Sequence, residues 1–325
     1  MDNNLIFSPE KVRDMRYYAV FGNPVLHSRS PQIHNSLFVR DNINAFYTRI
    51  HAETGRAVCE IIRGLGLAGA NVTTPFKEEV IPFVDRLSAD AEKIGAVNTI
   101  INTGGYLVGY NTDGDGITGL LDDEGVVLSK SRCLMIGAGG AGKSAALGLL
   151  NAGADVFITD MDTDKASDYA ERTGCGFSVL EEAVQKIGEF NIVVLAIPPG
   201  IYPFEFDQIL PGMTIVDANY RSPSETGVLE SLPCKVIKGD GWLLYQAVKA
   251  YHLFTGEKAD IETMKKGMKE DIDPENLVIK ILKNDSLDFR SYAAADILVD
   301  GRGMDDEHIN LIIDEEKSRA FGDKR

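Results

Sequence analysis

The fold of this chain is decided by a glycine-rich stretch, Leu134-Met135-Ile136-Gly137-Ala138-Gly139-Gly140-Ala141-Gly142-Lys143-Ser144. The pattern G-x-G-x-x-G follows an apolar run directly and precedes a segment with helical periodicity. In such a strand–turn–helix the first glycine makes the tight turn, the second lets the backbone approach a pyrophosphate, and the third allows close helix–strand contact. Free N–H groups at the start of the helix then face the anion. The stretch therefore predicts a dinucleotide site formed by residues 137–142.

An acidic residue supports this interpretation. Asp160 stands 23 positions after Gly137, in Phe157-Ile158-Thr159-Asp160-Met161-Asp162, close to the ~20-residue spacing of a ribose-binding carboxylate. A carboxylate there accepts hydrogen bonds from ribose hydroxyls and repels a 2′-phosphate, so we expect NAD, with NADP less favoured. The alternative is a helix N-cap, a role that Asp162 or Thr163 also suits.

Apolar, β-branched runs alternate with helical patterns along most of the chain, which predicts an α/β fold with parallel sheets covered by helices. Gly104-Gly105 predicts a hairpin and hence an antiparallel feature. The expected helices include residues 30–39, 57–64, 143–151 and 164–173. The expected strands are residues 17–21, 45–50, 69–72, 97–101, 133–136, 155–159, 192–196, 214–217 and 235–238.

Composition limits the classes of function. The chain has 325 residues, 44% hydrophobic content and a net charge of −16, so two domains are expected and binding to nucleic acid or to an anionic membrane is disfavoured. No stretch approaches the ~20 apolar residues of a transmembrane helix. The four cysteines are scattered and form no CxxC pair, so no metal site is expected. We predict a cytoplasmic protein, monomer or homodimer, with a small-molecule substrate.

Two turns carry candidate acid–base groups. Lys77 ends Asn71-Val72-Thr73-Thr74-Pro75-Phe76-Lys77, where the proline restricts the backbone. Asp113 stands in the turn Tyr110-Asn111-Thr112-Asp113-Gly114. A lysine and an aspartate on separate turns are the minimum parts of an acid–base pair. A surface salt bridge is the alternative.

Taken together, these segments resemble the shikimate dehydrogenase family, including its quinate/shikimate branch. The resemblance covers about residues 17 to 270 and joins several motifs in the family's order. Besides the glycine-rich stretch, the matching segments are Phe21-Gly22-Asn23-Pro24-Val25-Leu26-His27-Ser28-Arg29-Ser30-Pro31, residues 69–77, Gly95-Ala96-Val97-Asn98-Thr99, Asn111-Thr112-Asp113-Gly114 and residues 239–246.

The resemblance implies a discontinuous substrate domain with a mixed sheet and a Rossmann-type domain with a doubly wound parallel sheet. It also implies hydride transfer between a nicotinamide and 3-dehydroshikimate or shikimate, in aromatic amino acid biosynthesis. Lys77 then moves the proton, with Asp113 orienting it or sharing the work. The implied substrate residues are Ser28, Ser30 and Tyr220 at the carboxylate, and Thr73, Asn98, Asp113 and Gln246 at the ring hydroxyls. The implied cofactor residues are Gly137, Ala138, Gly139, Gly140, Ala141, Gly142, Asp160, Ile197 and Gly239.

Three departures from the family pattern shape these expectations. Asp160-Met161-Asp162 replaces the usual Asn-Arg-Thr of NADP-type members, which favours the NAD-using branch. The loop near the nicotinamide usually begins with asparagine and begins here with Ala196. The single tryptophan, Trp242, replaces a methionine, so the identity of the ring acid is less fixed than the reaction. Quinate dehydrogenase and a non-catalytic dinucleotide-binding protein remain the alternatives.

Several residues also have plain structural interpretations. One of the two serines can cap the following helix, and Asn98 can satisfy backbone groups at a strand end. A glutamine alone on a helix, such as Gln246, usually faces solvent. We interpret His27 and His34 as structural, because the lysine–aspartate pair already supplies a path for the proton.

The expected domain limits are 1–115 for the first part of the substrate domain, 116–240 for the NAD-binding domain and 241–272 for helices that return to the substrate domain. Residues 273–325 are charged, with short apolar runs at 277–282 and 309–313. We expect this tail to be an appendage, so that truncation after Ile272 leaves turnover and cofactor preference nearly unchanged.

Overall fold

The computed structural model describes residues 14–198, 200–219, 227–283 and 295–322. The described chain forms two compact units, each made of several stretches of sequence. The first contains residues up to 88, 97–110 and those from 250 onward, and the second contains residues 89–96 and 111–249. The expected limits at 115/116 and 240/241 thus lie close to the changes of unit at 110/111 and 249/250.

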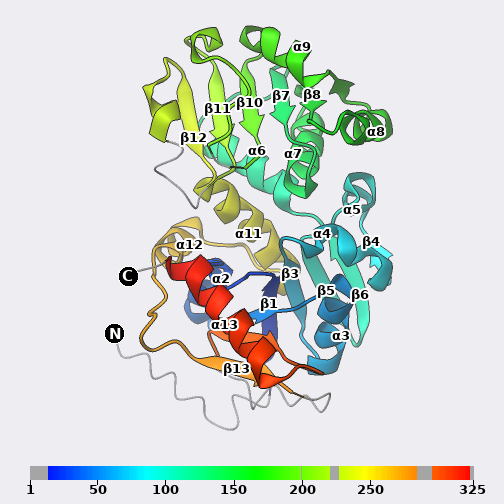
Figure 1. Ribbon diagram of the computed structural model, residues 1–325, viewed down its shortest axis with the longest axis vertical. Helices are drawn as coiled ribbons and strands as arrows, with labels where there is room; N and C mark the ends of the chain where they lie inside the picture. The colour runs from blue at the N-terminus through cyan, green and yellow to red at the C-terminus, as the bar shows by residue number, and fades with distance from the viewer. Residues whose placement is uncertain (1–13, 199, 220–226, 284–294, 323–325) are drawn as a thin grey trace. The chain divides into compact units, whose positions relative to one another are not determined.

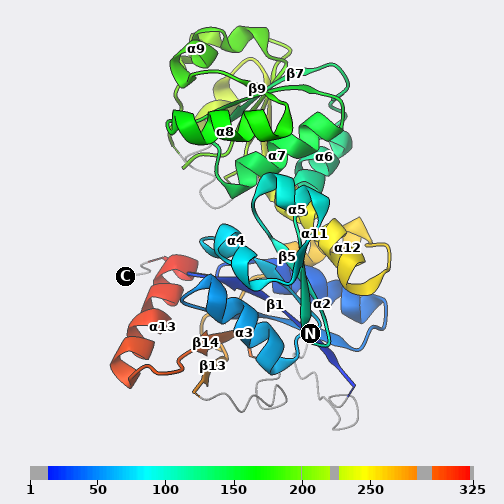
Figure 2. The same cartoon turned by 90° about the vertical axis from the view of Figure 1, so that its right-hand side faces the viewer.

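The first unit is built on an eight-stranded mixed sheet with strand order β13-β14-β2-β1-β3-β5-β6-β4. Neighbouring strands run parallel except for β3 with β5 and β5 with β6. Figure 2 shows α3 and α13 on one side of this sheet and α2 and α12 on the other. The strands are β1 (Arg16–Gly22), β2 (Ala45–His51), β3 (Gly69–Val72), β4 (Arg86–Leu87), β5 (Thr99–Thr103), β6 (Tyr106–Tyr110), β13 (Ile279–Leu282) and β14 (Ile297–Asp300). The helices are α2 (Ser30–Arg40), α3 (Gly55–Leu65), α4 (Phe76–Glu79), α12 (Ile261–Met268) and α13 (Asp306–Phe321), with the short 3-10 helix Ile81–Phe83.

Local sequence explains where these elements begin and end. Thr54 caps α3 by accepting a hydrogen bond from the Ala57 N–H at 3.1 Å, and Gly66 ends that helix in the left-handed conformation with φ 63°. Gly104 and Gly105 both have positive φ, 62° and 95°, and join β5 to the antiparallel β6. The predicted hairpin is therefore confirmed.

The second unit holds a six-stranded parallel sheet in the order β12-β11-β10-β7-β8-β9. Counted along the chain, this is the doubly wound order 3-2-1-4-5-6, so the predicted Rossmann-type sheet is confirmed (Figure 1). The strands are β7 (Arg132–Ile136), β8 (Asp155–Thr159), β9 (Gly176–Phe177), β10 (Ile192–Leu195), β11 (Thr214–Asp217) and β12 (Lys235–Lys238). The helices are α5 (Ala89–Ile94), α6 (Asp113–Asp123), α7 (Gly140–Asn151), α8 (Thr163–Thr173) and α9 (Leu180–Gln185), with 3-10 helices Ile187–Glu189, Phe206–Gln208 and Gly227–Ser231.

Two cores cover the two faces of this parallel sheet. Cys133 and Met135 face a core with α6, α7 and α8, while Leu134 and Ile136 face a second core with Ile187. Alternation along β7 places successive side chains on opposite faces. Helix α11 (Asp240–Thr255) carries the chain from the second unit into the first after residue 249.

The tail differs from the expected appendage. Strand β14 pairs in parallel with β2, and β13 pairs in parallel with β14, so both extend the sheet of the first unit. All four residues of β14 are buried. These pairings make the described part of the tail an integral part of that unit.

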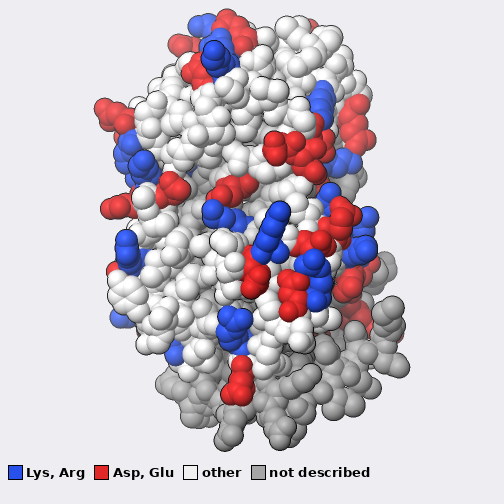
Figure 3. Space-filling model, turned by 180° about the vertical axis from the view of Figure 1, so that it is seen from behind, with Lys and Arg blue, Asp and Glu red and all other residues white. Residues whose placement is uncertain are grey.

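The surface carries charges of both signs. On the face shown in Figure 3, Lys and Arg side chains lie among Asp and Glu side chains. Among the described residues, no helix has the length and apolar character needed to cross a membrane.

Candidate active site

The glycine loop (residues 137–142) joins β7 to α7 in the geometry that its three glycines predict. Gly137 has φ 111°, and a Cβ on Gly142 would lie 1.9 Å from the Gly137 carbonyl oxygen. A Cβ on Gly139, in contrast, would meet no protein atom within 4 Å. The first and third glycines therefore shape the loop, while the second leaves its backbone open. This open backbone at the start of a helix suits a pyrophosphate.

Asp160 lies against the glycine loop at the carboxyl end of β8. Its Oδ2 accepts a hydrogen bond from the Ala138 N–H at 2.5 Å, and its Oδ1 accepts one from the Asp162 N–H at 2.9 Å. The helix cap is Asp162, which accepts from the Lys165 N–H at 3.1 Å. The N-cap alternative thus belongs to Asp162, while Asp160 holds the position predicted for a ribose ligand. The side chain of Met161 is 89% exposed.

Two further predicted cofactor residues lie at strand ends of the same sheet. Ile197 follows β10, and its Cγ2 would be 3.2 Å from a Cβ on Gly137. Gly239 follows β12 and approaches the Ala218 carbonyl so closely that a Cβ would lie 2.4 Å from its oxygen. Both positions are at the carboxyl edge of a parallel sheet, where ligands of doubly wound folds bind. Tyr220 lies outside the described residues.

The serine loop (residues 23–30) follows β1 in the first unit. Ser28 and Ser30 are 7% and 4% exposed, and the Ser28 Oγ accepts a hydrogen bond from the Ser30 N–H at 3.3 Å. The Ser28 N–H donates to the Val25 carbonyl at 2.9 Å, which closes a turn. The N-cap of α2 is Arg29, without a side-chain cap bond. Neither serine caps the helix in the way that the alternative requires.

Main-chain hydrogen bonds join the serine loop to the Thr73–Lys77 turn, and that turn to the Asn98 segment. The Asn23 N–H donates to the Thr74 carbonyl at 3.2 Å, and the Val97 N–H donates to the Lys77 carbonyl at 2.7 Å. At the end of β1, a Cβ on Gly22 would lie 2.7 Å from the Thr73 Cγ2. The fold of the first unit therefore brings the segments of Ser28, Thr73, Lys77 and Asn98 together.

Asn98 lies at the start of this antiparallel part of the sheet and is 3% exposed. Its carbonyl accepts from the Val72 N–H at 2.8 Å and from the Asn71 Nδ2 at 3.2 Å. Its side-chain Oδ1 accepts from the Thr99 hydroxyl at 2.9 Å. The hydrogen bond between Asn98 and the backbone of the neighbouring strand β3 is thus made by its main-chain carbonyl.

The second unit holds Asp113 at the first position of α6, where a carboxylate faces the positive end of the helix. The Asp113 N–H donates to Asn111 Oδ1 at 3.0 Å, and the indole N–H of Trp242 donates to the Asp113 carbonyl at 2.8 Å. Trp242 is 6% exposed and fixes the backbone of the predicted acid–base residue. Gln246 is 8% exposed and accepts from the Thr112 hydroxyl at 3.4 Å, so it is buried and not a solvated helix position.

His34 is part of an aromatic core, as the structural interpretation predicts. Its ring stacks on Tyr47 with 4.7 Å between centroids and an angle of 10°, and it lies near Phe254. Burial lowers the pKa of His34 to about 3, so the imidazole is neutral at physiological pH. Its two ring nitrogens have no hydrogen-bond partner.

Known proteins match this chain over most of its length. A shikimate dehydrogenase (NADP(+)) of Geobacillus kaustophilus is 37% identical over 267 residues, which are 77% of this chain and 96% of the relative. Residues 20–100 match the family described as the shikimate dehydrogenase substrate binding domain. This chain belongs to the shikimate dehydrogenase family. Residues 133–220 match a second family, described as NADP oxidoreductase, coenzyme F420-dependent.

Solved structures agree with this family membership. A shikimate 5-dehydrogenase of Thermus thermophilus, in complex with NADP(H) and shikimate, matches with a TM-score of 0.69 at 29% identity, covering 78% of this chain and 99% of that one. A shikimate 5-dehydrogenase of Listeria monocytogenes, in complex with shikimate and NAD, matches with a TM-score of 0.68 at 26% identity, covering 78% and 96%.

Sequence reasoning missed three charged residues around the serine loop of this shikimate dehydrogenase family member. Arg49 and Glu316 are both 2% exposed, and His51 is 3% exposed. Charged side chains are seldom buried without partners, so their burial marks a specific arrangement. Their sequence neighbourhoods give no signal, because each residue contacts segments far away in the chain.

Proposed function

We propose that this chain is a shikimate dehydrogenase that transfers a hydride reversibly between a nicotinamide dinucleotide and 3-dehydroshikimate or shikimate. The observation that carries the proposal is the joining of the serine loop, the Thr73–Lys77 turn and the Asn98 segment by main-chain hydrogen bonds within one unit. Hydroxyl and amide groups gathered in this way suit a polyhydroxylated ring, because such sites reject analogues that lack the hydroxyls.

The family resemblance gives each residue a role in this proposal. Ser28 and Ser30 bind the substrate carboxylate, and Thr73, Asn98, Asp113 and Gln246 bind ring hydroxyls. Tyr220 is proposed near the carboxylate. In the reduction, Lys77 donates a proton to the carbonyl oxygen as negative charge develops there, and in the oxidation it accepts that proton. Asp113 keeps the lysine in the correct orientation or shares the proton.

The residues of the second unit fit a dinucleotide. The open backbone at Gly139 and the N-terminus of α7 suit its pyrophosphate. When bound, the nicotinamide supplies or accepts the hydride. Residues 137–142 and Asp160, with Ile197 and Gly239, are the proposed contacts.

We further propose that NAD is preferred over NADP by at least about tenfold, which corresponds to ~1.4 kcal/mol. The relatives named above include NADP(+) enzymes, so this proposal depends on the residues of this chain. Asp160 lies against the glycine loop, Asp162 follows it, and Met161 stands between them. A carboxylate facing the 2′-position repels a phosphate there.

One assay tests the reaction. Purified protein is mixed with shikimate or quinate and with NAD or NADP, and the absorbance of the reduced nicotinamide at 340 nm is followed. We expect the highest kcat/KM with shikimate and NAD, whereas a higher value with quinate would assign the chain to quinate oxidation. No absorbance change in any combination would favour a protein that binds the dinucleotide without chemistry.

Two sets of variants test the assigned residues. We expect Lys77→Ala to lower kcat by ~10²–10⁴, the usual range for a positioned acid–base group, with a much smaller change in KM. Asp160→Ala combined with Met161→Arg is expected to narrow or reverse the NAD preference, while the exposed Asp164→Ala is the matched control. A wild-type enzyme that favours NADP would remove Asp160 from its role.

A further inference from the structure

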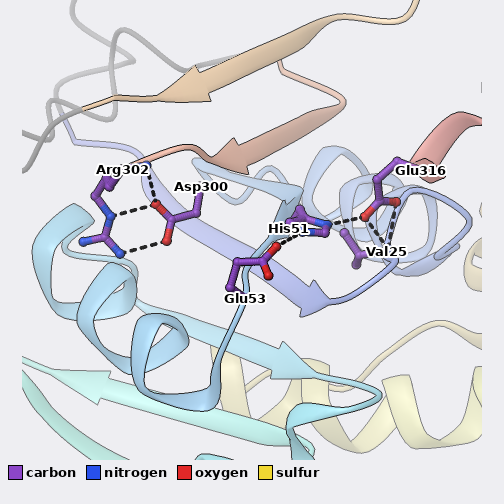
Figure 4. A network of polar contacts seen from close by, with 6 residues as sticks. All are labelled: Val25, His51, Glu53, Asp300, Arg302 and Glu316. Atoms are coloured by element: carbon purple, nitrogen blue, oxygen red, sulfur yellow. Dashed lines mark hydrogen bonds and ion pairs between the residues drawn. The ribbon is translucent and has the colours of Figure 1, made fainter. Parts of the chain in front are cut away.

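The tail places a buried carboxylate behind the serine loop. Glu316, on α13, is 2% exposed, and both its oxygens accept the Val25 N–H at 2.9 Å. Its Oε2 also accepts the Leu26 N–H at 2.7 Å. Figure 4 shows this carboxylate facing Val25 and His51. Two successive backbone N–H groups of the loop are therefore fixed by a side chain 291 positions away from Val25.

A buried positively charged side chain, that of Arg49, holds the next part of the same loop. The Arg49 guanidinium, 2% exposed on β2, donates to the Ser28 carbonyl from Nε at 3.0 Å and from Nη2 at 2.6 Å. Its Nη1 donates to the carbonyl of Asp296, in the tail, at 3.2 Å. An anion thus holds the N–H groups before Ser28, and a cation holds the carbonyl of Ser28 itself.

A third charged group orients the carboxylate. The Nδ1 of His51 lies 2.7 Å from Glu316 Oε1, and its Nε2 lies 2.9 Å from Glu53 Oε1. Carboxylates at both ring nitrogens require two N–H donors, which is the protonated imidazole. The cation between them reduces the cost of burying the Glu316 charge.

Strand pairing explains why the tail reaches this position. Strand β14 pairs with β2 at Arg49, Ile50 and His51, the part of β2 that carries two of the charged groups. The chain then enters α13, whose Ile309 and Ile312 are buried and whose next inward position is Glu316. The spacing of three and four residues places these side chains on one face of the helix.

We propose that Glu316 is a positioning residue for the substrate carboxylate, acting through the backbone of the serine loop. The inference rests on the proposed function, which assigns Ser28 and Ser30 to that carboxylate. Because Glu316 occupies the N–H groups of Val25 and Leu26, the loop presents the serine hydroxyls to the substrate. The tail thereby contributes to substrate affinity without contacting the substrate.

Kinetics of Glu316→Gln, which keeps the shape of the side chain and removes its charge, test this role. We expect KM for shikimate to rise about tenfold, a factor that corresponds to ~1.4 kcal/mol, with kcat and the dinucleotide KM within about twofold. Loss of carboxylate binding remote from the reacting carbon raises KM without lowering kcat. The matched control is Glu315→Gln, an exposed neighbour on the same helix, and it should change nothing.

A double-mutant cycle separates positioning from general stability. In a Ser28→Ala background, Glu316→Gln should add less than about a twofold change in KM, because both substitutions remove the same substrate contact. Fully multiplicative effects would contradict the proposal. So would an unchanged shikimate KM, or equal rises in the shikimate and dinucleotide KM values. Glu316→Asp, which keeps the charge but shortens the reach, should give an intermediate KM and covers the case in which Glu316→Gln does not fold.

Hydrogen exchange gives a readout that does not depend on activity. In Glu316→Gln the amides of Val25 and Leu26 should exchange faster than in the wild type, and in Glu315→Gln they should not. An inactive wild type would overturn the proposed function, and the substrate role of Glu316 with it, while exchange would still report on the loop. Unchanged exchange at Val25 and Leu26 in an active enzyme would overturn the present inference alone.

Discussion

The glycine loop and the serine loop both follow the first strand of their sheets, but they are held in different ways. The glycine loop owes its shape to its own residues, since Gly137 and Gly142 allow a contact that a Cβ would block. The serine loop is held from outside, by Glu316 and Arg49. A short sequence motif predicts the conformation of a loop that is shaped by its own backbone. The conformation of a loop held by distant charged side chains cannot be predicted in this way, because it depends on the folding of the whole unit.

The largest effect is expected from removing the tail, which supports the serine loop from outside. Within the described part of the tail, truncation after Ile272 deletes the buried Ala295 and six larger buried apolar side chains, Leu282, Ile297, Leu298, Val299, Ile309 and Ile312. At ~1.5–3 kcal/mol for each of the six larger side chains, their loss is of order 10 kcal/mol and comparable with the ~5–15 kcal/mol stability of a typical protein. We therefore expect the first unit to unfold, contrary to the expectation from sequence that turnover is retained.

Thermal unfolding and urea titration of residues 1–272 and of the full chain measure this effect. Shikimate turnover should be lost. Turnover within about threefold of the full chain would show that the tail strands contribute little, and that the serine loop is shaped by its own sequence after all.

The converse change is made in the glycine loop. Gly142→Ala places a methyl group against the Gly137 carbonyl, so we expect a lower melting temperature and a loss of dinucleotide affinity of more than ~100-fold. Overpacking of a tight site typically costs ~1–3 kcal/mol, and more where the backbone cannot shift.

Gly139→Ala is the matched control, because its Cβ would meet no protein atom within 4 Å. It should weaken dinucleotide binding by about tenfold while leaving the melting temperature of the free protein unchanged. A similar fall in melting temperature for both variants would mean that the second glycine also shapes the loop and does not simply leave room for the ligand.

The same contrast explains how much the sequence predicts. The motif of Gly137, Gly139 and Gly142 predicts the parallel sheet and the position of Asp160, because these residues lie within one short stretch of sequence. All nine expected strands are present, with ends displaced by at most two residues. The sequence does not predict β13 and β14, because they lie in a charged segment and are held by long-range pairing, β13 with β14 and β14 with β2. It also does not predict the two-residue strands β4 and β9. In the sequence, Glu316 cannot be distinguished from the many acidic residues expected at the surface. Only the packing of α13 in the folded unit buries it.

A smaller effect concerns the acid side of the stability profile. Burial lowers the pKa of His34 to about 3, below its ordinary value of ~6.5. The neutral ring therefore contributes stability above pH ~6.5, and this contribution is lost as pH falls towards 3, at up to ~1.4 kcal/mol per pH unit. We expect His34→Phe, which suits the surrounding aromatic rings, to flatten the stability profile between pH 6 and 4. Urea unfolding at several pH values measures the slope, and an unchanged slope would mean that His34 is hydrated.

The smallest expected effect is a fall in stability as pH rises, opposite in sign to that of His34. It comes from His51, which contacts the Glu316 carboxylate behind the serine loop. Burial lowers the pKa of His51, but hydrogen bonds and charges from Glu316 and Glu53 outweigh it and raise the pKa above its ordinary value. A raised pKa contributes stability that is fully present below pH ~6.5 and is lost as pH rises through the value in the folded protein. His51→Gln should remove this decline, whereas the exposed His308→Gln on α13 should retain it. The protection of the Val25 and Leu26 amides, taken relative to their intrinsic exchange rate at each pH, should fall over the same pH range in the wild type, because a neutral ring no longer donates to both carboxylates. A decline in stability without a loss of protection would separate His51 from the serine loop and leave Glu316 as its support without help from the imidazole.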